Sequence, residues 1–237
     1  MTILYEERPS DSPYVDTIMH GHTMSDGSPT RPAEICWHMV IVRQKGNVQL
    51  LVVGPWTTSG ITSYTEGAEI LWIRFKLGVF MPHLPTNKFL DSETILPGAA
   101  RGSLWLNGSA WQYPAYENAD TFVDRLVRED VLVRDPVVNA VLQGHPQEIP
   151  PRTIRHRFLR ATGLNQNHIQ QFERARQAAA LLEQGVSVLD AVYHVGYYDQ
   201  PHLTRSLKRF IGYTPGQLSH TGAPEETGQL ILAETHA

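Results

Sequence analysis

Cysteine is almost absent from this sequence, since Cys36 is the only one among 237 residues. A single cysteine excludes an internal disulfide and favours a reducing compartment. The sequence has no apolar run near the ~20 residues that a membrane span needs. Its N-terminus has no basic region followed by an apolar stretch, so no secretion signal is expected. These absences predict a cytoplasmic location without a membrane partner.

Signals of common catalytic and cofactor sites are also missing. The sequence has neither a phosphate-binding glycine loop nor a nucleophile elbow. His20, His22 and His38 offer metal-binding side chains, but neither their spacing nor their strand context favours a metal site. Cys36 lies in an apolar run and is expected to be buried and inert. We therefore predict no metal, no cofactor and no enzyme activity.

Charge is distributed unevenly along the chain. The formal net charge is −4, but residues 1–135 carry five more acidic than basic side chains, whereas residues 136–220 carry four more basic than acidic ones. The last 17 residues contain three glutamates and neither lysine nor arginine, which predicts a flexible acidic tail over 221–237. Only the segment 136–220 has the charge that suits a polyanion.

Residues 1–130 are predicted to form a β-rich domain that senses a ligand or pairs subunits. Short runs rich in Val, Ile, Trp, Tyr and Phe are separated by Gly or Pro, which is typical of a β-sandwich or a barrel. The clearest runs are 35–42, 48–53, 61–64 and 70–75. All five tryptophans lie in this part, where they serve either core packing or an aromatic ligand cavity.

Residues 131–220 are predicted to form an all-α domain, after a first helix that Asn118 caps. Asp135, with Pro136 at the first helical position, starts the next helix. The segment 144–150 contains Gly and two prolines and is predicted to be a loop. A long helix is expected over 165–184, with an apolar stripe at spacings of three and four residues.

Two further helices follow the long one. Ser187 and Asp190 resemble a capping box that opens a helix, and Asp199 caps the next one. Gly196 between them permits a sharp turn. Two helices joined by a short turn that contains glycine form a helix-turn-helix.

An internal repeat links two short basic segments, 151–163 and 200–212. A shift of 49 residues aligns the following pairs: Ile154 with Leu203, Phe158 with Leu207, Arg160 with Arg209, and Gly163 with Gly212. Each segment has one apolar face, formed by Ile154, Phe158 and Ala161 in the first and by Leu203, Leu207 and Phe210 in the second. A repeat of this kind indicates a duplicated structural unit, here a pair of helix-turn-helix units.

The other side of each basic helix is polar. The first presents Arg152, Arg155, His156 and Arg160, and the second presents Gln200, His202, Arg205 and Arg209. Such a helix fits the major groove, where Arg pairs with guanine and Gln with adenine. A linker helix of about 20 residues spans roughly 30 Å, close to the ~34 Å between successive grooves on one face of DNA. Arg157 points partly to the apolar side and is expected to form a structural ion pair.

The run from Asp190 to Phe210, closed by Gly212-Tyr213-Thr214-Pro215, resembles the C-terminal DNA-binding domain of AraC/XylS-type transcription regulators. The resemblance covers roughly residues 136–220 and implies two helix-turn-helix units joined by a linker helix. One departure is that the loop 144–150 stands where the family has a complete helix before the first recognition helix. Residues 73–80 and Gly54-Pro55 resemble the β-rich sensor domains that precede some such domains, which implies a cupin-like fold.

The resemblance also implies which residues contact DNA. Base contacts are expected at Arg152, Arg155, His156, Gln200, Pro201, His202 and Arg205. Phosphate contacts are expected at Arg160, Thr204, Lys208 and Arg209, toward the helix ends. Pro201 has no side-chain donor, so its contact would be apolar, for example with a thymine methyl group.

The leading interpretation is a sequence-specific transcription regulator that responds to a small-molecule effector through its N-terminal domain. Its expected partners are double-stranded promoter DNA, RNA polymerase, the effector and a second copy of the chain. One alternative is a cupin-like enzyme that depends on a metal or ligand and carries a helical domain. Another is a DNA-binding protein whose N-terminal half only pairs subunits. The sequence does not identify effector-binding residues.

Overall fold

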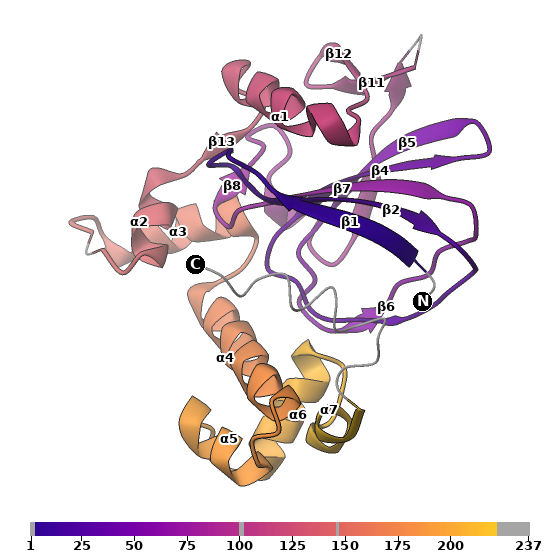
Figure 1. The fold of residues 1–237 in the computed structure, drawn as a ribbon. Helices are drawn as coiled ribbons and strands as arrows, with labels where there is room; N and C mark the ends of the chain where they lie inside the picture. The colour runs from indigo at the N-terminus through magenta and orange to yellow at the C-terminus, as the bar shows by residue number, and fades with distance from the viewer. Residues whose placement is uncertain (1–2, 100–101, 146, 222–237) are drawn as a thin grey trace.

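The computed structural model describes residues 3–99, 102–145 and 147–221, which form a β-rich N-terminal half and a helical C-terminal half (Figure 1). The strands are β1 Ile3–Pro9, β2 Val15–Thr23, β3 Thr30–Arg31, β4 His38–Gln44, β5 Asn47–Val53, β6 Gly60–Ile61, β7 Glu69–Phe75, β8 Val79–Phe80, β9 Glu93–Ile95, β10 Gly98–Ala99, β11 Ser103–Leu106, β12 Ser109–Gln112 and β13 Val133–Arg134. The helices are η1 Thr86–Lys88, η2 Tyr116–Asn118, α1 Ala119–Arg128, α2 Pro136–Leu142, α3 Pro151–Thr162, α4 Gln166–Glu183, α5 Val188–Val195, α6 Gln200–Phe210 and α7 Pro215–Thr221. The predicted α+β architecture is confirmed.

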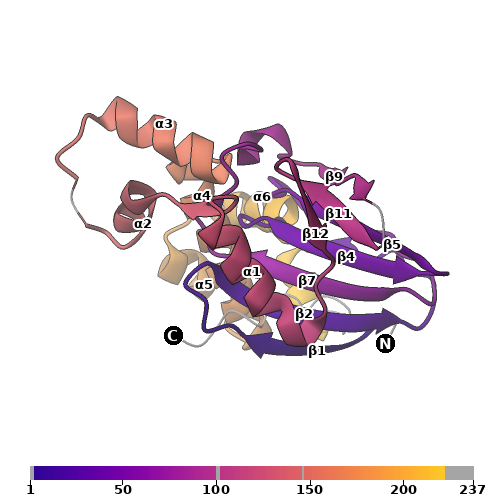
Figure 2. The same cartoon turned by 90° about the horizontal axis from the view of Figure 1, so that it is seen from above.

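The N-terminal half is built on a six-stranded antiparallel sheet in the order β1-β2-β7-β4-β5-β9. Side chains alternate across a strand, so Ile18, Ile41 and Ile73 lie together in the larger apolar core on one face. On that side, α1 and the hairpin β11–β12 contribute Val123 and Trp111 to the same core (Figure 2). One face of the sheet is therefore closed by the chain itself.

The opposite face of the sheet carries a smaller apolar cluster formed by Val40, Ala68 and Ile70, with Trp72 half-buried beside it. Below this face lie the short strand β6 and helix α6 (Figure 1). Trp37 and Trp111 serve the core packing expected of the tryptophans, since both are buried, whereas Trp105 is 49% exposed.

The predicted strand positions differ in how well they match the structure. The runs 48–53 and 70–75 coincide with β5 and β7 to within a residue. The run 35–42 begins its strand only at His38, because the Glu34 carboxylate accepts a bond from the Cys36 N–H and turns the chain there. The run 61–64 is mostly loop and leaves only the two-residue strand β6.

Three of the four predicted helix caps match the structure, because capping depends on residues within one turn. Asp135 accepts bonds from the N–H groups of Val137 and Val138 at 2.9 and 3.1 Å. Ser187 and Asp199 accept from the third residue beyond them, at 3.2 and 2.7 Å. Asn118 precedes α1 as predicted, but its side chain does not cap α1. Its Oδ1 instead accepts the Ala115 N–H, which closes η2.

The helical half and the N-terminal half share one apolar cluster. Ala33, Cys36 and Phe80 of the N-terminal half lie in the same buried cluster as residues of α3 to α7. Cys36 is buried, as predicted. Helix α1 lies before residue 131 and strand β13 lies after it, and one apolar cluster joins residues on both sides, so the predicted boundary at residue 131 stays a prediction.

The predicted tail 221–237 lies outside the described residues apart from Thr221. Helix α4, with 18 residues, is about 27 Å long at 1.5 Å per residue. It therefore confirms the long linker helix expected over 165–184. Within the described ranges, none of the helices combines the length and the apolar character that crossing a membrane requires.

Candidate nucleic-acid interface

Helix α6 presents a polar face away from its core. Leu203, Leu207 and Phe210 are fully buried against the rest of the helical half. On the other side, Gln200 and Arg205 are exposed. Asp199 caps the helix, so the first turn is ordered where the first base contacts are expected. The second basic segment therefore forms the amphipathic helix that its sequence predicts.

The remaining residues expected to contact DNA from α6 differ in exposure. Pro201, Lys208 and Arg209 are exposed, whereas His202 and Thr204 are half-buried. The ring of His202 packs edge-on against Tyr197, with 5.1 Å between the centroids. The hydroxyl of Thr204 donates to the Gln200 carbonyl of its own helix at 2.9 Å.

Helices α5 and α6 form the second helix-turn-helix. Gly196 closes α5 with φ 72°, a left-handed conformation that glycine adopts readily. After this turn, Tyr197 is buried and its hydroxyl is hydrogen-bonded to Ser206 of α6 at 2.8 Å. The guanidinium of Arg174 on α4 lies over the Tyr197 ring, 4.5 Å from its centroid. Tyr197 therefore links the turn to both the linker helix and the recognition helix.

Helix α3 repeats the pattern of α6. Phe158 and Ala161 are buried, and Ile154 packs against the same cluster while half-buried. The side chains predicted to contact DNA are all exposed, namely Arg152, Arg155, His156 and Arg160. Gly163 ends α3 with φ 72°. Gly212, which the repeat aligns with Gly163, also has a positive φ, of 94°.

Arg157 of α3 forms the structural ion pair that was predicted for it, and its partner is Asp135. Its Nε donates to Asp135 Oδ2 at 2.9 Å, and the Asp135 side chain is only 10% exposed. The prediction of an ion pair is confirmed. Arg157 lies beside the apolar stripe of α3 rather than opposite it, and this position predicted the ion pair.

The first unit departs from a compact helix-turn-helix. Helices α2 and α3 are separated by eight residues, 143–150, in place of a tight turn. Pro150 stands at the N-cap of α3 and provides no side-chain cap. Helix α3 packs against α2, η1 and β8. Helix α3 of the shortened first unit is therefore held by η1 and β8 of the N-terminal half as well as by the preceding helix α2.

Three strongly exposed apolar or aromatic side chains lie on α5 or between α5 and α6, and none of them was predicted to be functional. Leu189 is 71% exposed, Tyr193 is 88% exposed and Tyr198 is 91% exposed. Leu189 and Tyr193 lie four residues apart on one side of α5, opposite its buried Ala191. Val188, Ala191, Val192 and Val195 of α5 pack against the apolar core, and their spacing in the sequence leaves positions 189 and 193 facing outward.

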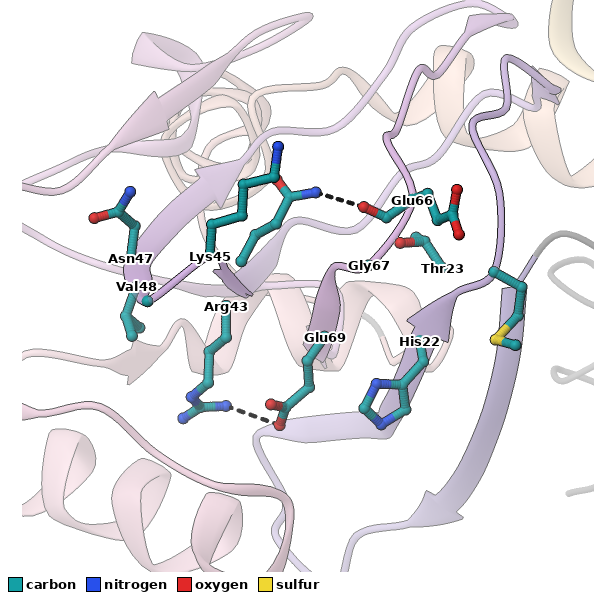
Figure 3. Close-up of a pocket in the computed structure, with 12 residues that line it drawn as sticks. His22, Thr23, Arg43, Lys45, Asn47, Val48, Glu66, Gly67 and Glu69 are labelled. Carbon is teal, nitrogen blue, oxygen red and sulfur yellow. Dashed lines mark hydrogen bonds and ion pairs between the residues drawn. The ribbon is translucent and has the colours of Figure 1, made fainter.

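A hollow of about 700 Å³ lies at one end of the N-terminal sheet, beside the end of β2, the turn between β4 and β5, and the start of β7 (Figure 3). Its lining includes His22, Arg43, Lys45 and Glu69, with Val48 as an apolar member. Arg43 Nη1 lies 3.4 Å from Glu69 Oε1. The hollow thus offers both donors and acceptors to a small polar molecule.

The three histidines considered as metal ligands do not converge. His20 pairs with Leu71 and His38 pairs with Arg74, so the two histidines lie on opposite faces of the sheet. Burial, with Arg74 as a second cause, lowers the pKa of His38 to about 3. In the described ranges, no group of three or more His, Cys, Asp or Glu side chains is arranged to hold a metal ion.

Comparison with known proteins supports a DNA-binding assignment for the helical half. Residues 148–221 match a family model described as a helix-turn-helix domain, of the AraC type. Two solved structures of ToxT are similar over 100% of this chain, each with a TM-score of 0.36. One, from Vibrio cholerae O395, is 11% identical over 99% of its own chain; the other, from Vibrio cholerae, is 8% identical over 100%. No curated protein matches the sequence.

Proposed function

We propose that this chain, whose residues 148–221 are an AraC-type helix-turn-helix domain, reads promoter DNA chiefly through α6. The proposed role of the chain is that of a DNA-binding transcription regulator. The observation that best supports this role of α6 is its amphipathic character. One side is fully buried, while the capped N-terminal part exposes Gln200 and Arg205. A helix of this form can enter the major groove and present side chains to base edges.

Base contacts are proposed for Gln200, Pro201, His202 and Arg205 of α6 and for Arg152, Arg155 and His156 of α3. Phosphate contacts are proposed for Arg160, Thr204, Lys208 and Arg209. Exposure supports most of these roles, whereas His202 and Thr204 would have to reach DNA from half-buried positions. A change of rotamer in Thr204 would release its hydroxyl from the Gln200 carbonyl and make it available to a phosphate.

Selection of DNA from a random duplex library tests this function. The full chain should enrich one sequence motif, because exposed Arg and Gln side chains discriminate between bases. Its affinity should fall steeply with salt, since each phosphate contact releases counterions. Binding that is equally tight to all duplexes would contradict sequence-specific reading. Failure to bind any duplex would contradict the proposed function as a whole.

The N-terminal half is proposed to sense a small-molecule effector, with the hollow beside His22 and Lys45 as its candidate site. A binding metabolite should raise the melting temperature of the full chain, because it stabilises only the folded state. His22→Ala should remove the rise, whereas His145→Ala, at an exposed residue outside the hollow, should retain it. An identical rise in both variants would place the ligand elsewhere.

Two protein partners belong to the same proposal. RNA polymerase is proposed to contact the exposed Leu189 and Tyr193 on α5, since exposed apolar side chains that lie together favour protein contacts. A second copy of the chain is proposed to pair through the N-terminal half. The proposed site of action is the cytoplasm, where promoter DNA is accessible, and no catalytic role is proposed.

A further inference from the structure

We propose that Asp91 is a positioning residue that fixes the placement of the two DNA-reading helices, α3 and α6, relative to each other. The inference rests on the proposed function, because it concerns how these helices engage the two parts of one DNA site. It assigns to the N-terminal half a mechanical role in DNA reading that is distinct from effector binding.

The N-terminal half holds both helices at equivalent backbone carbonyls. The hydroxyl of Thr86 donates to the Ala161 carbonyl of α3 at 3.0 Å, and Thr86 is fully buried. The backbone N–H of Ala33 donates to the Phe210 carbonyl of α6 at 2.6 Å. Ala161 and Phe210 are related by the 49-residue shift of the repeat. The last carbonyls of a helix lack partners within the helix, and here the N-terminal half supplies a donor at the same place in both.

The glycines that follow these carbonyls are also seated against the N-terminal half. A Cβ atom on Gly163 would lie 3.4 Å from the backbone nitrogen of Asn87. A Cβ atom on Gly212 would lie 2.5 Å from Thr30 Cγ2, which is too close to be tolerated without movement. Both helix ends are therefore packed in contact with N-terminal loops.

Helix α6 has a second attachment through Ser59. The Ser59 N–H donates to the Arg209 carbonyl at 2.7 Å, and the Ser59 hydroxyl donates to the Lys208 carbonyl at 2.9 Å. Lys208 and Arg209 are two of the proposed phosphate-contacting residues. A displacement of the loop that carries Ser59 would therefore move the C-terminal end of α6.

The two loops that hold the helices are bonded to each other at Asp91. One carboxylate oxygen of Asp91 accepts the Thr57 N–H at 2.6 Å, and the other accepts the Thr57 hydroxyl at 2.8 Å. The Asp91 N–H donates to the Pro55 carbonyl at 2.9 Å. Thr57 is two residues before Ser59, and Asp91 is three residues after the end of η1, which contains Thr86. The carboxylate thus connects the support of α6 with the support of α3.

Asp91 has a backbone conformation that few residues other than glycine adopt. Asp91 has φ 53°, in the left-handed region that Asp and Asn enter more readily than most other residues. Nearby, Gly54 passes so close to the Phe89 carbonyl that a Cβ atom could not be accommodated. The crossing of the two loops is therefore tightly packed, and movement of one loop would displace the other.

The test compares DNA sites of different geometry, using the motif selected by the full chain. Asp91→Asn keeps the shape and the left-handed propensity but removes the charge, and Thr57→Val removes the hydroxyl alone. Asp124→Asn, at an exposed position on α1, is the matched control. Each protein is titrated with the complete site, with sites in which one half is scrambled, and with a site carrying one added base pair between the halves.

The wild-type chain and Asp124→Asn should bind the complete site best and lose affinity when the base pair is added, because the insertion rotates one half-site by roughly 34° relative to the other. Asp91→Asn and Thr57→Val should bind the complete site about 10-fold less tightly, because the first loses the charge that strengthens both hydrogen bonds and the second loses one of the two bonds. Both should bind half-sites as the wild type does and should tolerate the inserted base pair better than the wild type.

Four results would overturn the inference. One is an unchanged preference for the original spacing in both variants. Another is an equal loss on complete and half-sites, which would give the carboxylate only a general structural role. If Asp91→Asn does not fold, Thr57→Val decides alone, and wild-type behaviour of that variant on every site overturns the proposal. A wild-type chain that selects no duplex overturns the proposed function and this inference with it.

Discussion

Asp135 bonds to Arg157 across 22 residues while it also caps α2. One oxygen of the carboxylate accepts from the Val137 and Val138 N–H groups, and the other accepts the Arg157 Nε–H at 2.9 Å. A single side chain therefore begins one helix of the first unit and fixes the next helix against it. In this chain, that bond joins α2 to α3 in spite of the eight-residue segment between them.

Replacing this carboxylate should destabilise the fold. Asp135→Ala removes a helix cap, which contributes about 1 kcal/mol, and a charge-assisted bond of about 1.5–3 kcal/mol. Because the Arg157 side chain is 38% exposed and partly screened by water, we expect a total loss of about 2 kcal/mol. Urea unfolding of the full chain measures the change. Asp124→Ala, on the exposed face of α1, should change the free energy of unfolding by less than about 0.5 kcal/mol.

Arg205→Ala should weaken DNA binding with a base-specific signature. The loss of a bidentate contact with guanine costs about 1–3 kcal/mol and relaxes preference at one position. Titrations with the selected site and with its single-base variants measure both effects. Arg128→Ala removes the same charge at an exposed position on α1 and should leave affinity unchanged. An equal loss on every duplex would instead assign Arg205 to a phosphate.

Tyr197→Phe should loosen the attachment of α6 to its turn. The variant loses the 2.8 Å hydrogen bond with Ser206 but keeps the ring that packs against Arg174 and His202. We expect a decrease of about 1 kcal/mol in the free energy of unfolding. Tyr198→Phe is the matched control, because that side chain is 91% exposed, and its stability should equal that of the wild type. Equal effects of the two substitutions would refute the structural role of the Tyr197 hydroxyl.

His38 should make the fold sensitive to acid. Its pKa is lowered from 6.5 to about 3, so the unfolded chain takes up a proton at a higher pH than the folded chain. The stability contributed by neutral His38 is therefore present above pH 6.5 and is lost as the pH falls toward 3. Unfolding of His38→Gln should show a shallower decline over this window than the wild type. His22→Gln, at an exposed position, should retain the wild-type slope.

Gly212→Ala should disturb the junction between α6 and the N-terminal half. The backbone has φ 94°, which strains any residue with a Cβ atom, and that atom would collide with Thr30 Cγ2. A decrease of more than about 1 kcal/mol in stability is expected. Gly216→Ala, within α7 and with open space around it, should be neutral or stabilising by up to about 1 kcal/mol. Wild-type stability of Gly212→Ala would show that the junction yields easily.

Features that depend on neighbouring residues were predictable from the sequence. The caps at Asp135, Ser187 and Asp199 follow from side chains that reach only the next turn of backbone. The apolar stripes of α3 and α6 follow from the helical period, as the burial of Phe158 and Leu207 shows. Asn118 was the exception, because η2 precedes α1 and competes for its side chain.

The sequence alone determined the amphipathic helices, their order and the polar faces that α3 and α6 expose, because helical periodicity and capping act within a few residues. Only the tertiary structure decided that Ala33 and Thr86 would hold equivalent carbonyls of these two helices, and that Asp91 would bond to Thr57. Those partners lie far apart in the chain or follow no repeating pattern. Their meeting depends on how the sheet, its loops and the helices pack, since hydrogen bonds between distant segments form only where packing brings the donor and the acceptor together.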